Sequence, residues 1–163
     1  MARTSGFFDA LLSGGEYDRV YSSADYCDNL ATVIKNGVRY SADNDLAVSA
    51  GNGMSITVGI GRAWINGHWF YNDTAYTDLF VSTAPTGSNS RIDRVVLRLN
   101  TAVATRSIEL LIKTGTAAAS PVAPPIERAG DVYELGLATI LVNPGVTSIT
   151  TDKITDTRAD GSV

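Results

Sequence analysis

The sequence holds a single cysteine and a single histidine, and this scarcity limits the chemistry open to it. Cys27 cannot form a disulfide within the chain, and Cys27 with His68 cannot supply the ligands of a zinc site. The sequence contains no G-x-S-x-G elbow, full G-x-G-x-x-G loop or Walker motif. We therefore predict no catalytic residue, no cofactor and no metal, and we do not expect an enzyme.

The sequence also lacks a long apolar run and an excess of basic residues. No stretch reaches the roughly 18 apolar residues that could span a membrane, and the opening MARTSGFFDALLSGGEYD lacks the apolar core of a signal peptide. Lys and Arg number 13 against 17 Asp and Glu, which argues against nucleic acid as a main partner. We expect synthesis in a reducing cytosol and no membrane insertion.

Two acidic stretches invite a metal interpretation. Asp43, Asn44 and Asp45 lack the Gly and Glu positions of a twelve-residue calcium loop, so turn chemistry explains them better. Asp152, Asp156 and Asp160 recur every four residues, but the surrounding sequence is rich in threonine and favours strand or loop over helix. Neither stretch predicts a metal site.

The 163 residues, of which 44% are hydrophobic, suit one domain with a core. Residues 1–16 read as a docking arm, and residues 17–37 contain one amphipathic helix, expected over 22–36 with Ser22 or Ser23 as its cap. Its apolar face would comprise Tyr26, Leu30, Val33 and Ile34. From residue 38 to 163, apolar and polar residues alternate with a period of two, and turn residues recur between these stretches. The expected fold is mainly β: an antiparallel, sandwich-like β domain preceded by the helix and the extended arm.

Two hairpins can be placed in the β domain. Asn66-Gly67 predicts a tight turn within residues 62–71. In RVVLRLNTAVATRSIELLIK, one register sorts the side chains by face. It places Val95, Leu97 and Leu99 opposite Ile112, Leu110 and Ile108 on an apolar face, and Arg98, Val96 and Arg94 opposite Glu109, Leu111 and Lys113 on the other.

The charges of this second hairpin have a structural interpretation. Arg94 and Lys113 would repel each other unless Glu127, Glu134 or a carboxylate of another chain lies nearby. Asp93 falls on the apolar side, where we expect it to bond backbone N–H groups or a guanidinium. The Pro- and Ala-rich segment 114–130 cannot be a central strand and should run extended across a surface.

Two apolar groups are candidates for binding. Phe7, Phe8, Leu11 and Leu12 lie in the polar arm, and we expect them to pack on a neighbouring subunit. Aromatic residues also gather around the first hairpin, where such rings are more often core or interface. The alternative is a platform on which sugars stack, formed by Trp64, Trp69 and Tyr71.

Several phrases, in order, resemble the N-terminal domain of tail-tip proteins from phages and prophages of Gram-positive bacteria. They are DRVYSSADY (18–26), NGV (36–38), GMSITVGIGRAWINGHWF (53–70), SRIDRVVLRL (90–99), GTAAASPVAP (115–124), YELGLATILV (133–142) and ITDTR (154–158). The resemblance implies a baseplate or tail-fibre attachment module of the virion, made in the bacterial host cytoplasm. It also implies docking to other tail proteins, a homo-oligomer that is commonly a trimer, and no catalytic motif. The chain ends soon after ITDTR, which favours attachment over direct host recognition.

Three functions therefore remain open from the sequence. The first is a structural phage tail protein, and the second is a carbohydrate-binding module that recognises host cell-wall saccharide. The third and weakest is a hydrolase or its accessory domain. A hydrolase would need paired carboxylates, but the hairpin register places Asp93 and Glu109 on opposite faces.

Overall fold

The computed structural model describes residues 6–39 and 45–158. Its largest sheet has five strands, β9 (Arg91–Asn100), β10 (Ser107–Lys113), β11 (Arg128–Ala129), β12 (Val132–Val142) and β13 (Ile154–Asp156). The strand order is β10-β9-β12-β11, and β13 also pairs with β12. All pairings in this sheet are antiparallel.

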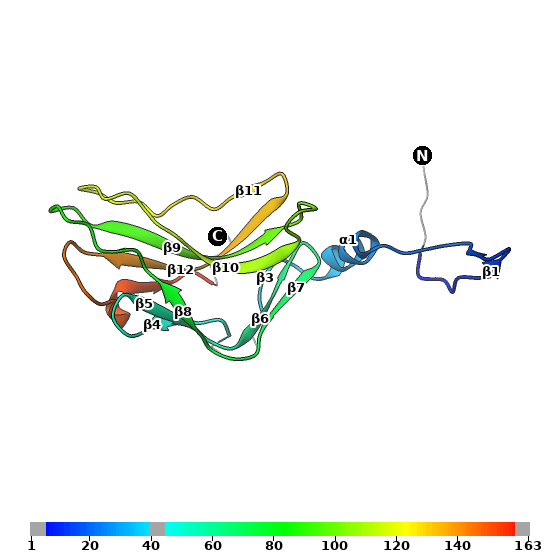
Figure 1. The fold of residues 1–163 in the computed structure, drawn as a ribbon, viewed down its shortest axis with the longest axis horizontal. Helices are drawn as coiled ribbons and strands as arrows, with labels where there is room; N and C mark the ends of the chain where they lie inside the picture. The colour runs from blue at the N-terminus through cyan, green and yellow to red at the C-terminus, as the bar shows by residue number, and fades with distance from the viewer. Residues whose placement is uncertain (1–5, 40–44, 159–163) are drawn as a thin grey trace.

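Two small antiparallel sheets form the second layer, below the large sheet in Figure 1. One contains β3 (Gly37–Val38), β6 (Gly61–Ile65) and β7 (His68–Asn72), and the other contains β4 (Val48–Ala50), β5 (Ser55–Val58) and β8 (Tyr76–Phe80). A short 3-10 helix, Thr151–Lys153, precedes β13. The predicted class, a mainly β, antiparallel, sandwich-like domain with one helix, is confirmed.

The core lies between the layers because alternate residues of each strand point inward. Ile56 and Ile65 from the small sheets meet Leu97, Leu137 and other buried residues of the large sheet. The predicted β9–β10 register is correct at every predicted pair, from Leu99 opposite Ile108 to Arg94 opposite Lys113. The predicted tight turn is also confirmed, since Asn66 and Gly67 both have positive φ angles, 47° and 75°, as a type I′ turn requires.

A β-bulge in β12 was not predicted. The register shifts between Gly136 and Ala138, so Leu137 is an extra residue in the strand. Before the bulge Leu135 is buried, and after it Ala138, Ile140 and Val142 are buried. A strand of strict period two would turn one of these sets to the outer face. The bulge keeps both sets in the core.

The arm and the helix α1 (Ser23–Val33) extend away from the two layers at one end of the molecule (Figure 1). Ser22 is the N-cap: its hydroxyl accepts from the Asp25 N–H, and the Asp25 carboxylate accepts from the Ser22 N–H at 2.7 Å. The helix is shorter than expected, because Ile34 is its C-cap. No residue of α1 is buried, so its apolar face, including Tyr26 and Val33, is not part of the core.

Candidate functional site

The arm presents its four large apolar side chains to solvent. Phe7, Phe8, Leu11 and Leu12 are 53%, 57%, 69% and 64% exposed. Within the described residues, this chain therefore offers them little burial, which is the situation expected of residues that pack on another subunit. Their contact with a neighbour remains a prediction.

The arm nevertheless has local structure. Leu12–Ser13 (β1) pairs with Glu16–Tyr17 (β2) around a Gly14-Gly15 turn in which both φ angles are positive. The Leu11 N–H donates to Asp18 Oδ1 at 2.8 Å, which closes the base of this small hairpin. The hairpin therefore presents its apolar residues in an ordered backbone.

Aromatic rings attach the arm to the helix. The Phe7 ring lies 5.5 Å from the Tyr21 ring and 5.3 Å from the Tyr26 ring, between centroids, and the Phe8 N–H donates to the Tyr21 hydroxyl at 3.0 Å. Phe7 adopts a φ of 64°, an uncommon conformation for a bulky residue. The arm thus leaves α1 at a defined point, beside Tyr26.

The helix in turn rests on the tip of the β6–β7 hairpin. The Asn66 N–H donates to Asn36 Oδ1 at 2.6 Å, and the Asn36 amide donates to Asn66 Oδ1 at 2.8 Å. A side chain at Gly67 would meet the Cys27 carbonyl oxygen at 2.0 Å, so only glycine allows this approach. His68 follows this turn, and its Nδ1 lies 3.0 Å from the Asn66 carbonyl oxygen.

An open groove of about 990 Å³ lies where helix, hairpin and large sheet meet. We call it the α1–β7 groove. Tyr26, Trp69 and Tyr71 line it and remain 49%, 64% and 44% exposed. Its other lining residues are Ser23, Ala24, Cys27, Asp28, Leu30, Asn66, Gly67, His68, Phe70, Leu99, Asn100, Thr101, Arg106, Ser107 and Ile108.

The three aromatic residues of the alternative sugar platform share one face of the β6–β7 hairpin. Trp64 is directly opposite Trp69, and Tyr71 follows two residues later, opposite Arg62. Trp64 is half-buried, while the other two rings are exposed. The Arg62 guanidinium lies 3.9 Å from the centre of the Tyr71 ring and occupies one face of it. Among the three, only Trp69 and Tyr71 line the groove.

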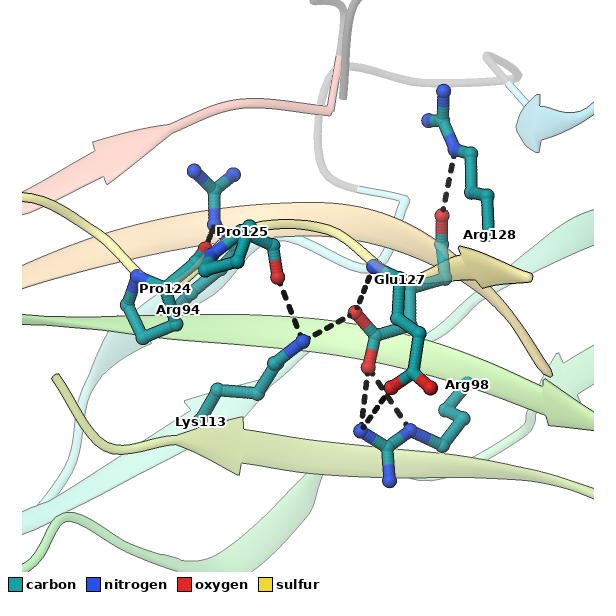
Figure 2. Close-up of polar contacts among 8 residues, drawn as sticks. Arg94, Arg98, Lys113, Pro124, Pro125, Glu127 and Arg128 are labelled. Carbon is teal, nitrogen blue, oxygen red and sulfur yellow. Dashed lines mark hydrogen bonds and ion pairs between the residues drawn. The ribbon is translucent and has the colours of Figure 1, made fainter.

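The charged outer face of the large sheet is covered by the Pro-rich segment (Figure 2). Arg94 Nε donates to the Pro124 carbonyl at 2.7 Å, and Lys113 Nζ donates to the Pro125 carbonyl at 2.7 Å. The Glu127 N–H donates to Glu134 Oε2 at 2.8 Å. Arg94 and Lys113 therefore bind the backbone of the Pro-rich segment 114–130, which we call the strap, and they do not line an anion pocket.

Glu134 is the centre of this arrangement, and it is fully buried. It accepts from Lys113 Nζ at 2.7 Å and from Arg98 at 2.7 and 2.9 Å. Burial acts to raise the pKa of Glu134, but the bonds from Lys113, the Glu127 amide and Arg98 outweigh it, so the pKa lies below its usual value. The predicted need for a carboxylate near Lys113 is met by Glu134, and Arg98 bonds to it although Glu109 faces Arg98 in the register.

A second buried ion pair lies on the core side of β9. Arg91 and Asp93 are 5% and 0% exposed, and Arg91 Nε lies 2.9 Å from Asp93 Oδ1. Asp93 also accepts from the Gly115 N–H at 2.8 Å, and Arg91 donates to the carbonyls of Ser82 and Thr83. Both roles predicted for Asp93 are confirmed, and the pair joins two loops to the sheet.

The acidic residues near the C-terminus are paired with cations. Asp152 bonds to Lys153, and Asp156 bonds to Arg158, which holds the pKa of Asp156 below its usual value. Asp43, Asn44 and Asp160 lie outside the described residues. Over residues 6–39 and 45–158, no group of three His, Cys, Asp or Glu side chains could hold a metal ion. In the same ranges, no helix has the length and apolar character needed to cross a membrane.

The apolar arm, the aromatic face of the first hairpin and the extended course of segment 114–130 over a surface were all anticipated from the sequence, but the groove was not. The groove combines residues 23–30, 66–71 and 99–108, and no local pattern signals that these segments meet. Comparisons of the chain with protein-family models, curated proteins and solved structures found no match.

Proposed function

We propose that the chain is a structural attachment module of a phage tail, which docks through its N-terminal arm and helix to other copies or other tail proteins. The observation that carries this proposal is that the arm and α1 lie outside the core. The helix has no buried residue, and the four large apolar side chains of the arm are more than half exposed. Such apolar surface is typical of an interaction site.

The phage context of the proposal rests on the order of the sequence phrases from DRVYSSADY to ITDTR. The attachment role agrees with a β domain whose polar clusters hold its own backbone. Glu134 and Asp93 each bond to cations and to backbone N–H groups of this chain. In this role the protein is a component of the virion, has no enzymatic activity, and forms a homo-oligomer in which a trimer is the first expectation.

Light scattering on the wild-type chain and two double variants tests the docking role. Leu11→Ser/Leu12→Ser should lower the measured mass, because it removes apolar surface from the arm. Val103→Ser/Val122→Ser is the matched control, since both valines are about as exposed, at 81% and 79%, and lie outside the arm. A wild-type mass equal to one chain, or an oligomer that the arm variant leaves intact, contradicts docking of the arm to other copies.

The virion location needs a separate experiment. Antibodies against the chain should label the tail tip of purified phage particles in electron micrographs. Labelling of the capsid, or of no particle, contradicts the location.

A carbohydrate-binding module is the second candidate, favoured by one observation. Trp64, Trp69 and Tyr71 share one hairpin face, as a stacking platform requires. A glycan array separates the two functions, because an adaptor should bind no saccharide. Saccharide binding that Trp69→Ser abolishes would favour the module.

A further inference from the structure

We propose that the α1–β7 groove receives the N-terminal arm of a second copy of this chain, so that copies assemble by exchanging arms. The inference deepens the proposed docking role and rests on it, since it names the surface on which the arm is buried. The occupant is the segment from Phe8 to Tyr17.

The arm and the groove both expose large apolar side chains that could cover each other. Phe8, Leu11, Leu12 and Tyr17 are each more than half exposed, and Tyr26, Trp69 and Tyr71 are exposed in the groove. Large side chains bury roughly 150–250 Å² each, so these arm residues carry on the order of 400 Å² of exposed surface. In a closed ring of copies, each chain takes part in two arm–groove contacts, one through its arm and one through its groove. Counted on both partners, these two contacts bury roughly 1,600 Å², within the roughly 1,200–2,000 Å² of a standard interface.

The backbone around the groove suits an extended segment. In the described part of the chain, β7 pairs only with β6, and β10 pairs only with β9. His68 to Tyr71 of β7 and the first residues of β10 line the groove, so two strand edges border it. Unpaired strand edges bind extended chains by adding a strand. The arm supplies strand backbone of its own, since β1 and β2 form a small hairpin whose outer edges pair with no other strand in the described part of the chain.

The charges are complementary. Residues 8–17 contain Asp9 and Glu16 and no Lys or Arg, and Asp18, just beyond them, is already paired with Arg19 at 2.9 Å. Arg106 lines the groove and is exposed, and its guanidinium has no carboxylate partner among the described residues. Asp28 also lines the groove and would disfavour an acidic arm close to it. The acidic residues of the arm are therefore placed near Arg106, at the β9–β10 end.

The position of the arm explains why a second copy is the partner. Tyr26 lines the groove and also stacks on Phe7, so each arm begins at the rim of its own groove. From there residues 8–17 lead away from the β layers (Figure 1). When copies meet at this rim, the arm of one copy leads into the groove of the next.

Photo-crosslinking between isotope-labelled and unlabelled chains tests the inference. Phe8 is replaced by benzoylphenylalanine in the full-length chain, and ¹⁵N-labelled and unlabelled protein are mixed, unfolded and refolded together. Mass spectrometry then identifies the crosslinked residues. We expect mixed-isotope crosslinks from position 8 to residues 23–30, 66–71 or 99–108. The same probe at Val122, on the strap and 79% exposed, should give none of these.

The outcomes separate this inference from the proposed function. Crosslinks within one chain to residues 66–71 or 99–108 would show that the arm folds into its own groove, and crosslinks only to another surface of a second copy would place the arm elsewhere; each overturns the inference and leaves oligomerisation intact. Crosslinks within one chain to the region of Tyr21 and Tyr26 are the background that the Phe7 and Phe8 contacts produce. A protein that remains a single chain by light scattering overturns the inference and the proposed homo-oligomer.

Trp69→Ser gives a second, independent measurement. It should lower the oligomer mass as far as Leu11→Ser/Leu12→Ser does. Phe80→Ser, which removes a ring of similar exposure from β8, 72% against 64% for Trp69, should not. An unchanged mass together with loss of saccharide binding would assign the groove to a sugar and overturn the inference.

Discussion

Lys113 Nζ lies 2.7 Å from Glu134 Oε2, although Lys113 belongs to β10 and Glu134 to β12, with β9 between them. The contact therefore crosses the width of one strand on the outer face of the sheet. Because the same carboxylate accepts from Arg98 of β9 and from the Glu127 N–H of the strap, Glu134 joins three strands and the Pro-rich segment.

Replacing this carboxylate should destabilise the fold. Glu134→Gln keeps the size of the side chain but leaves Arg98 and Lys113 without their buried counter-charge. Loss of one partner of a buried ion pair costs about 3–5 kcal/mol, and the partial exposure of the two cations places this variant at the lower end of that range. Urea unfolding measures the change. Glu109→Gln, at an exposed position of β10 on the same face of the sheet, should change stability by less than about 0.5 kcal/mol. Equal effects of the two substitutions would contradict the central role of Glu134.

The same carboxylate predicts how stability depends on pH. The pKa of Glu134 is lowered in the folded protein, so below the unfolded value of about 4.3 the unfolded state binds more protons. The stabilisation from Glu134 is thus fully present above that value and is lost as the pH falls through the folded pKa. The difference in unfolding free energy between wild type and Glu134→Gln should stay constant from pH 7 to about pH 5 and shrink in more acidic solution. A difference that grows in acid would mean that the folded pKa is raised.

The sequence predicts those features of the fold that depend on residues close together in the chain, and it does not predict those that depend on distant segments. The β9–β10 register could be predicted because alternation and the loop length select one pairing in which Leu97 meets Leu110. The bulge at Leu137 could not, since the alternation of YELGLATILV is compatible with a regular strand until the core on both sides is known. Glu134 was one of three carboxylates proposed to neutralise Lys113, and the choice among them required the position of β12.

The candidate site divides in the same way. An apolar residue such as Leu12 in a polar, glycine-containing segment is conspicuous in the sequence. Its exposure in the folded chain agrees with the prediction that it belongs to a docking arm. The groove depends on how close α1 comes to the β6–β7 turn. That distance is set by Gly67 and by the Asn36–Asn66 pair, and neither is visible without the tertiary structure.

Gly67→Ala tests this approach of the helix. Gly67 and Gly130 both have positive φ angles, 75° and 59°, so alanine costs about 1–2 kcal/mol at either position from backbone strain. At Gly67 the added carbon would also lie 2.0 Å from the Cys27 carbonyl oxygen, whereas at Gly130 nothing lies within 4 Å. Gly67→Ala should therefore displace the helix and speed amide hydrogen exchange in Ser23–Val33, and Gly130→Ala should not. Similar exchange rates in both variants would show that the helix does not depend on this contact.

Asp93→Ala should be among the most destabilising substitutions in the protein. It leaves the Arg91 guanidinium buried without a counter-charge and the Gly115 N–H without its acceptor, and such losses cost about 3–5 kcal/mol. Urea unfolding of Asp93→Ala should show this loss. The double variant Arg91→Met/Asp93→Leu removes both charges and should recover part of the stability, because an apolar pair of similar volume no longer carries an unpaired buried charge. Recovery should remain incomplete, since the carbonyls of Ser82 and Thr83 lose the donor that Arg91 provides. A double variant less stable than Asp93→Ala would mean that Arg91 is stabilised mainly by the two loop carbonyls, with the carboxylate contributing little.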